Sequence, residues 1–114
     1  MRSDRLYVAD MLDAIAAIER FMQGIDEPAF LANELVQSAV LQKLSIVGEA
    51  AARLSAAACA AMPAVPWKEI IGFRNIAVHA YFSVDWRVVH VTITDDLPPV
   101  KTALAAYRDV RPSA

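Results

Sequence analysis

The stretch PAFLANELVQSAVLQKLSIVGEAAARLSAAACA, residues 28–60, carries the longest helical pattern in this chain. Pro28 suits the first turn of a helix, and Asp26 or Glu27 stands near its N-cap position. One helix over this stretch would be roughly 50 Å long at about 1.5 Å per residue. Its apolar arc is wide, so we expect it to be buried both in its own bundle and against a second subunit. The arc comprises Leu35, Val36, Ala39, Val40, Leu44, Ile46, Val47, Ala50 and Leu54.

Shorter helical patterns flank this long one. Asp4 can cap a first helix that runs to about Gly24 and has a single apolar stripe. Pro63 and Pro66 interrupt the chain, because a proline disfavours helix in the residue before it. Pro66 then fits the start of a third helix. The buried face of that helix would consist of Trp67, Ile70 and Ile71.

The last part of the chain predicts two further helical segments. Asp85 can open a fourth helix, which Pro98-Pro99 must kink or restart because proline cannot continue the hydrogen-bond ladder. Asp95 or Asp96 could cap the final segment, which runs from Leu97 to about Arg108. The run Val88–Ile93 is the one place where a strand could intrude. The whole pattern predicts one all-α domain over residues 1–114, an antiparallel bundle of four to five helices.

Composition and charge narrow the class of protein. The net charge is −2, so the chain is no generic polyanion binder, and any nucleic-acid binding must rest on a local patch. The least charged stretch, Leu54–Trp67, is too short and too rich in proline to span a membrane. The N-terminal residues do not form a signal peptide, and Cys59 is the only cysteine, which excludes an internal disulfide. A cytoplasmic location is the default expectation.

The polar candidates cluster in Arg74-Asn75-Ile76-Ala77-Val78-His79-Ala80-Tyr81. On a straight helix Arg74 and His79 lie about 140° apart, because each residue turns about 100°. Asn75 and His79 share a face. Arg74 and His79 can therefore act together only if the helix ends near His79, if the arginine reaches round, or if a second subunit faces this helix across a two-fold axis. A hydrogen-bonded seam without catalysis is the alternative interpretation, and Tyr81 then has an ordinary packing role.

An arginine beside a histidine suits phosphate chemistry, and if the substrate is RNA these residue types could cleave it without a metal ion. His79 could take the proton from a ribose 2′-hydroxyl or give one to the leaving oxygen, while Arg74 binds phosphate oxygens with its planar fork. Asn75 could orient His79 or bind the RNA backbone. With two histidines and no acidic cluster at ligand spacing, no metal site is predicted. The second histidine, His90, lies in an apolar run and is expected to be structural.

A polar stripe follows the long helical stretch and includes Glu49 and Arg53. It is either a solvated face with a weak Glu49–Arg53 pair or the lining of a cleft. Gly48 permits another helix to approach closely at this point. Besides Arg74, the candidates for RNA backbone contact are Arg53, Lys68 and Arg87.

The motif at residues 74–81 resembles the R-x4-H-x-Y motif of HepT-like toxins in the HEPN superfamily. Further stretches match this family in the same order, so the resemblance spans nearly the whole chain. They are Arg5-Leu6-Tyr7, Ile46-Val47-Gly48-Glu49-Ala50, Arg53-Leu54-Ser55, Pro66-Trp67-Lys68-Glu69-Ile70-Ile71-Gly72 and Asp96-Leu97-Pro98.

The resemblance implies a homodimer that acts as a metal-independent ribonuclease without a cofactor. Its composite site would use Arg74 and His79 of both subunits, with Asn75 as a supporting residue. It also implies a partner, a nucleotidyltransferase antitoxin of the MntA type, which would transfer AMP onto Tyr81 and silence the toxin. The alternative is a non-catalytic helical dimer that serves only as the binding partner and modification substrate of such a nucleotidyltransferase.

Overall fold

The computed structural model describes residues 2–79 and 83–110, apart from the side chains of residues 77–79. Throughout these residues the regular structure is helical, which confirms the all-α fold predicted from the sequence. In chain order the elements are α1 (Asp4–Phe21), α2 (Glu27–Leu31), α3 (Glu34–Ala52), α4 (Ala56–Ala61), α5 (Trp67–His79), α6 (Trp86–Val91), the π-helical turn η2 (Thr92–Asp96) and α7 (Leu97–Val110).

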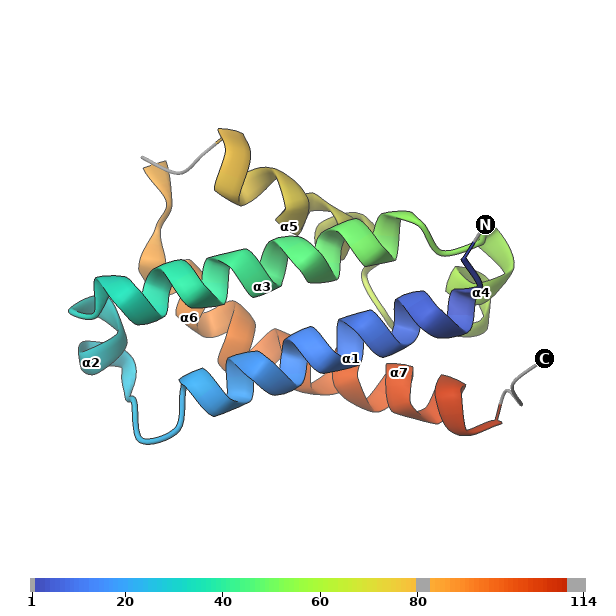
Figure 1. The fold of residues 1–114 in the computed structure, drawn as a ribbon, viewed down its shortest axis with the longest axis horizontal. Coiled ribbons are helices and arrows are strands. Elements are labelled where there is room, and N and C mark those ends of the chain that lie inside the picture. The colour runs from blue at the N-terminus through green and yellow to red at the C-terminus, as the bar shows by residue number, and fades with distance from the viewer. Residues whose placement is uncertain (1, 80–82, 111–114) are drawn as a thin grey trace.

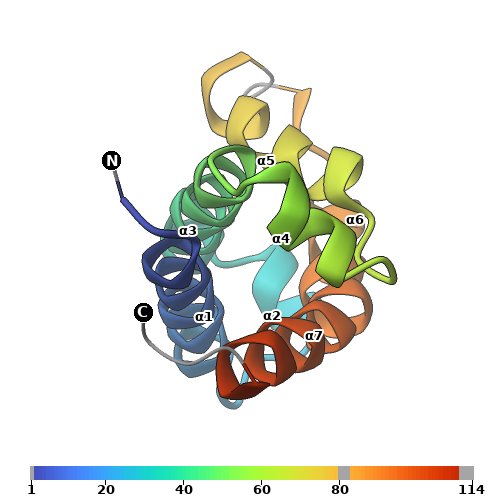
Figure 2. The same ribbon diagram turned by 90° about the vertical axis from the view of Figure 1, so that its right-hand side faces the viewer.

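The long helices α1, α3, α5 and α7 surround a common apolar centre (Figure 2). Each runs in the opposite direction to the previous one (Figure 1). α3 packs against both α1 and α5, and α1 also packs against α7. Leu35, which was expected on the buried arc, is instead 80% exposed.

Among the described residues, no helix is both long enough and apolar enough to cross a membrane. The largest fully buried side chains include Met11, Ile15, Phe30, Leu44, Ile70, Leu97 and Leu104.

The predicted helix over residues 28–60 is wrong as a single element, because the chain divides it into α2, α3 and α4. At the first break the side chain of Asn33 accepts a hydrogen bond from the Val36 N–H at 3.0 Å and caps α3. The amide of the buried Gln37 donates to the carbonyls of Phe30 and Leu31, at 3.0 and 3.1 Å. These bonds satisfy backbone groups that an unbroken helix would have paired internally.

The second break lies between α3 and α4, and here hydrogen bonds connect the start of α4 to the start of α1. Ser55 caps α4 by accepting a hydrogen bond from the Ala58 N–H at 3.1 Å. The Ser55 N–H and hydroxyl in turn donate to the carboxylate of Asp4, at 2.8 and 2.6 Å. Asp4 therefore does not cap α1 as predicted, and Ser3 occupies the N-cap position. The carboxylate instead ties together two helix ends that are far apart in the sequence.

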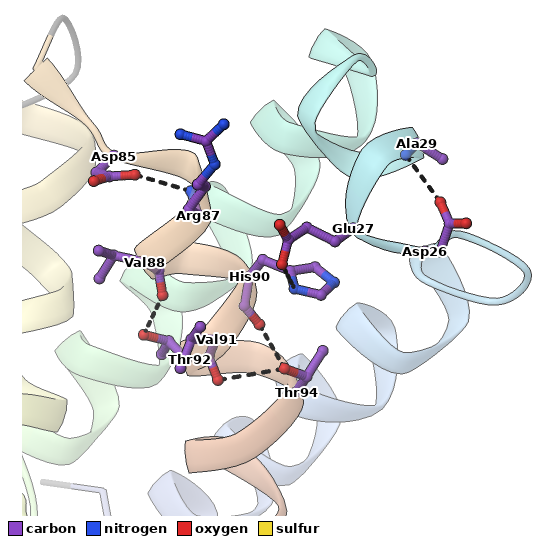
Figure 3. Close-up of polar contacts among 10 residues, drawn as sticks. All are labelled: Asp26, Glu27, Ala29, Asp85, Arg87, Val88, His90, Val91, Thr92 and Thr94. Carbon is purple, nitrogen blue, oxygen red and sulfur yellow. Dashed lines mark hydrogen bonds and ion pairs between the residues drawn. The ribbon is translucent and has the colours of Figure 1, made fainter.

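The run Val88–Ile93 is helical rather than extended, and the hydroxyls of Thr92 and of the following Thr94 donate to carbonyls one turn earlier in the chain. The Thr92 hydroxyl donates to the Val88 carbonyl at 2.9 Å, and the Thr94 hydroxyl donates to the His90 carbonyl at 2.8 Å (Figure 3). The chain then passes through η2 directly into α7. Asp95 and Asp96 lie within that π-helical turn, so neither caps a restarted helix as predicted.

α6 is held against α2 by a small aromatic and polar cluster. Asp85 caps α6 by accepting a hydrogen bond from the Arg87 N–H at 3.0 Å. His90 has a side chain that is only 13% exposed, and its Nδ1 lies 3.6 Å from Oε2 of Glu27 (Figure 3). The ring of Phe30 packs on His90 with a centroid separation of 5.7 Å. The largely buried position of His90 is the one that its apolar neighbours predict.

Candidate functional site

Arg74 lies on the flank of α5 that faces α3. Its side chain is 44% exposed, and its Nη1 is 3.7 Å from Oε2 of Glu49 on α3. Asn75, the next residue, is also exposed. The arginine is therefore accessible to a ligand while a carboxylate on the neighbouring helix restrains it. A guanidinium held in this way can bind two oxygens of a phosphate through its planar fork.

Glu49 connects two arginines rather than one. Its Oε1 accepts a hydrogen bond from Nε of Arg53 at 3.0 Å and lies 2.9 Å from another nitrogen of the same guanidinium. Its Oε2 faces Arg74. One carboxylate thus lies between two cations on two helices, and the local charge of the three groups is positive. The structure brings together the three residues that the sequence placed in two separate stretches.

Gly48 brings α3 close to α5 beside Arg74. A Cβ atom at Gly48 would lie 2.6 Å from the backbone nitrogen of Arg74 and 2.9 Å from the carbonyl oxygen of Ile70. Both atoms belong to the backbone of α5, so a larger residue would have to push the helix away. This contact confirms the close approach that was predicted at Gly48, and it fixes the distance between Glu49 and Arg74.

The other predicted residues lie along α5 or outside the described part. Lys68 is exposed and stands seven residues before Asn75, so the two share one face of the helix. His79 is the last residue of α5 in the described chain, and its side chain lies outside the described residues. Tyr81 lies outside them as well. The geometry of Arg74 relative to these two side chains therefore stays a prediction.

Two further residues belong to the same surface: Arg2, which the sequence did not single out, and Tyr7, which is part of the family-like stretch Arg5-Leu6-Tyr7. They line a groove between α1 and α3 together with Arg53. The guanidinium of Arg2 lies 4.9 Å from the centre of the Tyr7 ring and binds Asp10 at 2.5 Å. The hydrogen bond to Asp10 raises the pKa of Arg2 above its ordinary value. The resemblance of Arg5-Leu6-Tyr7 to the family was a signal for Tyr7, while no sequence pattern pointed to Arg2.

A different cavity of about 550 Å³ opens between α5, η2 and α7. Its floor is apolar and includes Ile70 and Phe73, while Glu69, Asp95 and Asp96 supply carboxylates to its lining. Carboxylates repel the phosphates of a nucleic acid, so the lining of this cavity disfavours nucleic-acid binding. Among the described residues, no group of three or more His, Cys, Asp or Glu side chains is placed to hold a metal ion.

The chain is similar to proteins of one family. A family model described as ribonuclease HepT-like matches residues 11–107. A Thermococcus cleftensis protein that carries the name ribonuclease HepT is 37% identical over 100 residues, which are 88% of this chain and 91% of that protein. A Methanocaldococcus jannaschii protein named as an RNase is 32% identical over 100 residues, which are 88% of this chain and 92% of that protein. No solved structure matches the chain.

The match to the family model contains the whole of α3 and α5 and therefore both helices that carry Glu49 and Arg74. The two relatives are aligned with most of this chain and with most of their own length. These findings confirm the resemblance that was seen in the motif at residues 74–81. The chain belongs to the HepT-like ribonuclease family of the HEPN superfamily.

Proposed function

We propose that this protein is a toxin that cleaves RNA without a metal ion, and that it is a homodimer with a composite site of Arg74 and His79 from both subunits. The observation that carries the proposal is the exposed guanidinium of Arg74, which Glu49 restrains at 3.7 Å on a helix that also contains His79. The family membership and the RNase names of the relatives support the same activity.

The chemistry requires a base, an acid and a cation. One His79 takes the proton of a ribose 2′-hydroxyl, whose oxygen attacks the adjacent phosphorus. The bond from phosphorus to the 5′-oxygen breaks, and that oxygen receives a proton from the other His79. The products are a 2′,3′-cyclic phosphate and a free 5′-hydroxyl. Arg74 stabilises the charge that builds on the phosphoryl oxygens, and Asn75 supports the histidine or the RNA backbone.

A dimer is supported by the exposed face of α5. The helix continues from Arg74 to His79, and about 100° of rotation per residue sets their positions about 140° apart. One copy therefore does not place both residues on one face. Gly72 lies beside Lys68 and Asn75, and a Cβ there would meet nothing within 4 Å. A glycine inside a helix costs about 0.5–1 kcal/mol relative to alanine, and no described neighbour requires it here. A second copy that packs closely on α5 would require it.

The activity of the toxin would be switched off by a covalent modification. A partner nucleotidyltransferase of the MntA type would transfer AMP from ATP to the phenolic oxygen of Tyr81, with release of pyrophosphate. The added phosphate is negative and lies two residues from His79 in the sequence, so it would compete with RNA for Arg74. Intact mass after co-expression with the partner should show whole adenylate units, and these should disappear in Tyr81→Phe. Adenylation that persists in Tyr81→Phe would place the modified residue elsewhere.

The deciding experiment is cleavage of RNA by the purified, unmodified protein in excess EDTA. Arg74→Ala and His79→Ala should each reduce the rate by about 10²–10⁴-fold, the range for loss of an acid, a base or a charge-stabilising group. Arg20→Ala removes an exposed arginine at the far end of α1 and serves as the control. Wild-type protein that does not cleave, or variants that cleave as well as wild type, would leave the chain as a non-catalytic partner of the nucleotidyltransferase.

The dimer is tested by sedimentation equilibrium. Wild-type protein should sediment as a dimer, and Gly72→Leu should shift it toward the monomer and reduce cleavage. Asp13→Leu places a leucine on the exposed face of α1. It should neither shift the protein toward the monomer nor reduce cleavage. A wild-type monomer that cleaves RNA at the same concentration would rule out the composite site.

A further inference from the structure

A groove between α1 and the C-terminal half of α3 continues from the candidate site. It consists of two adjoining hollows of about 170 and 610 Å³. Both hollows are lined by Arg2, Tyr7 and Arg53, and the smaller one is also lined by Glu49. Because Glu49 contacts Arg53 on one side and Arg74 on the other, the groove and the arginine of the motif form one continuous surface.

The side chains of this groove are those that single-stranded nucleic acids require. Two arginines, Arg2 and Arg53, have exposed fractions of 47% and 59% and can move to meet phosphates. The ring of Tyr7 is half-buried and already has a planar cation, the guanidinium of Arg2, 4.9 Å from its centre. A nucleobase is also planar and stacks on the same kind of ring face.

The carboxylates of the groove do not prevent such binding. Asp10 is paired with Arg2, and Glu49 is shared between Arg53 and Arg74. These five groups therefore carry a small positive charge together, on a chain whose total charge is −2. A phosphate that replaces Asp10 beside Arg2 would release the guanidinium from its present position over Tyr7.

We propose that this groove is a subsite for a nucleotide that flanks the scissile phosphate in single-stranded RNA. The base stacks on Tyr7 in the place that Arg2 now occupies, and the adjoining phosphates contact Arg53 and Arg2. The proposal rests on the proposed ribonuclease function. It states where the protein binds the part of the substrate that extends beyond Arg74. Single-stranded RNA is the form that fits, because bases within a duplex are not free to stack on a side chain.

The test compares KM and kcat for an RNA oligonucleotide that has one cleavage site. Tyr7→Leu should raise KM about tenfold, because loss of an aromatic ring on which a base stacks weakens RNA binding by roughly that factor. The same change should leave kcat within about twofold of the wild-type value. Tyr7→Phe keeps the ring and should behave as wild type. Arg53→Gln should raise KM and flatten the salt dependence of log KM by about 0.7, the slope for one phosphate contact on a single strand. Arg20→Gln is the matched arginine control, with no change expected.

Binding of the same RNA with a deoxyribose at its cleavage site gives a readout on wild-type protein that does not depend on a variant folding. This RNA cannot be cleaved by the proposed route, because it lacks the attacking 2′-hydroxyl. The ring protons of Tyr7 should shift upfield in NMR spectra during the titration, while those of Tyr107 on α7 should not. An unchanged Tyr7 signal with bound RNA, a Tyr7→Phe variant as impaired as Tyr7→Leu, or equal affinity for a duplex of the same sequence would overturn the subsite. Protein that binds RNA through Tyr7 but does not cleave it would retain the subsite and refute the ribonuclease function.

Discussion

Glu49 Oε2 lies 3.7 Å from Nη1 of Arg74, and this contact connects α3 to the helix that carries the motif. The same carboxylate holds Arg53 through its other oxygen. Both partners are about half exposed, so the contact contributes little to stability, with about 0–1 kcal/mol typical of such pairs. Its importance lies in where it holds the guanidinium of Arg74.

Glu49→Gln should lower both kcat and KM for RNA by about two- to tenfold, changes that correspond to less than about 1.4 kcal/mol. kcat falls because Arg74 loses the carboxylate that restrains it, and KM falls because one negative charge leaves the proposed RNA-binding surface. Steady-state kinetics with an oligonucleotide measures both constants. Glu19→Gln, which removes an exposed carboxylate paired with Lys101, is the control. Unchanged kcat in Glu49→Gln would show that the carboxylate does not position Arg74.

Gly48→Ala should destabilise the fold by about 1–3 kcal/mol, the usual cost of forcing an extra carbon into a close contact. The new Cβ would meet the Arg74 nitrogen at 2.6 Å, so α5 must move away from α3. Denaturation in urea measures the free energy of unfolding. Ser38→Ala changes an exposed residue of the same helix and should stay within about 0.5 kcal/mol of wild type. Full stability of Gly48→Ala would contradict the tight helix contact.

Gln37→Leu should cost about 1–3 kcal/mol, because it leaves the carbonyls of Phe30 and Leu31 without their buried donor. The change retains the apolar volume of the side chain, so a loss of packing does not explain the effect. Gln42→Leu makes the same substitution at an exposed position of α3. Comparable urea midpoints for the two variants would show that the break between α2 and α3 does not depend on Gln37.

The thiol of Cys59 should react slowly with a disulfide reagent near neutral pH. Burial, with a smaller effect of the Asp4 carboxylate, raises the pKa of this thiol above its ordinary value. The neutral thiol is favoured in the folded state, so its contribution to stability is present at neutral pH and is lost as the pH rises through the raised pKa. The rate at which Cys59 reacts with the reagent should begin to rise at a higher pH in the folded protein than in the urea-unfolded chain. Coincident pH profiles would contradict the shift.

Local sequence patterns determined the class of fold and most helix positions. Apolar residues at helical spacing predicted α1, α3 and α5, and the prolines at 63 and 66 predicted where α5 begins. The breaks within residues 28–60 were missed, because a side chain such as Asn33 caps a helix only where tertiary packing makes a break acceptable. The strand considered at Val88–Ile93 was wrong, because Asp85 caps a helix at this point and the described residues form no strand with which the run could pair.

The sequence by itself also determined the motif, which is a run of residue types, and the angle of about 140° between Arg74 and His79, which follows from the period of one helix. Only the tertiary structure decided which residues surround Arg74. The partners Glu49 and Arg53 come from another helix, and Arg2 and Tyr7 come from the start of the chain. Contacts between residues so far apart depend on how closely two helices pack, and at this site the missing side chain of Gly48 sets that distance.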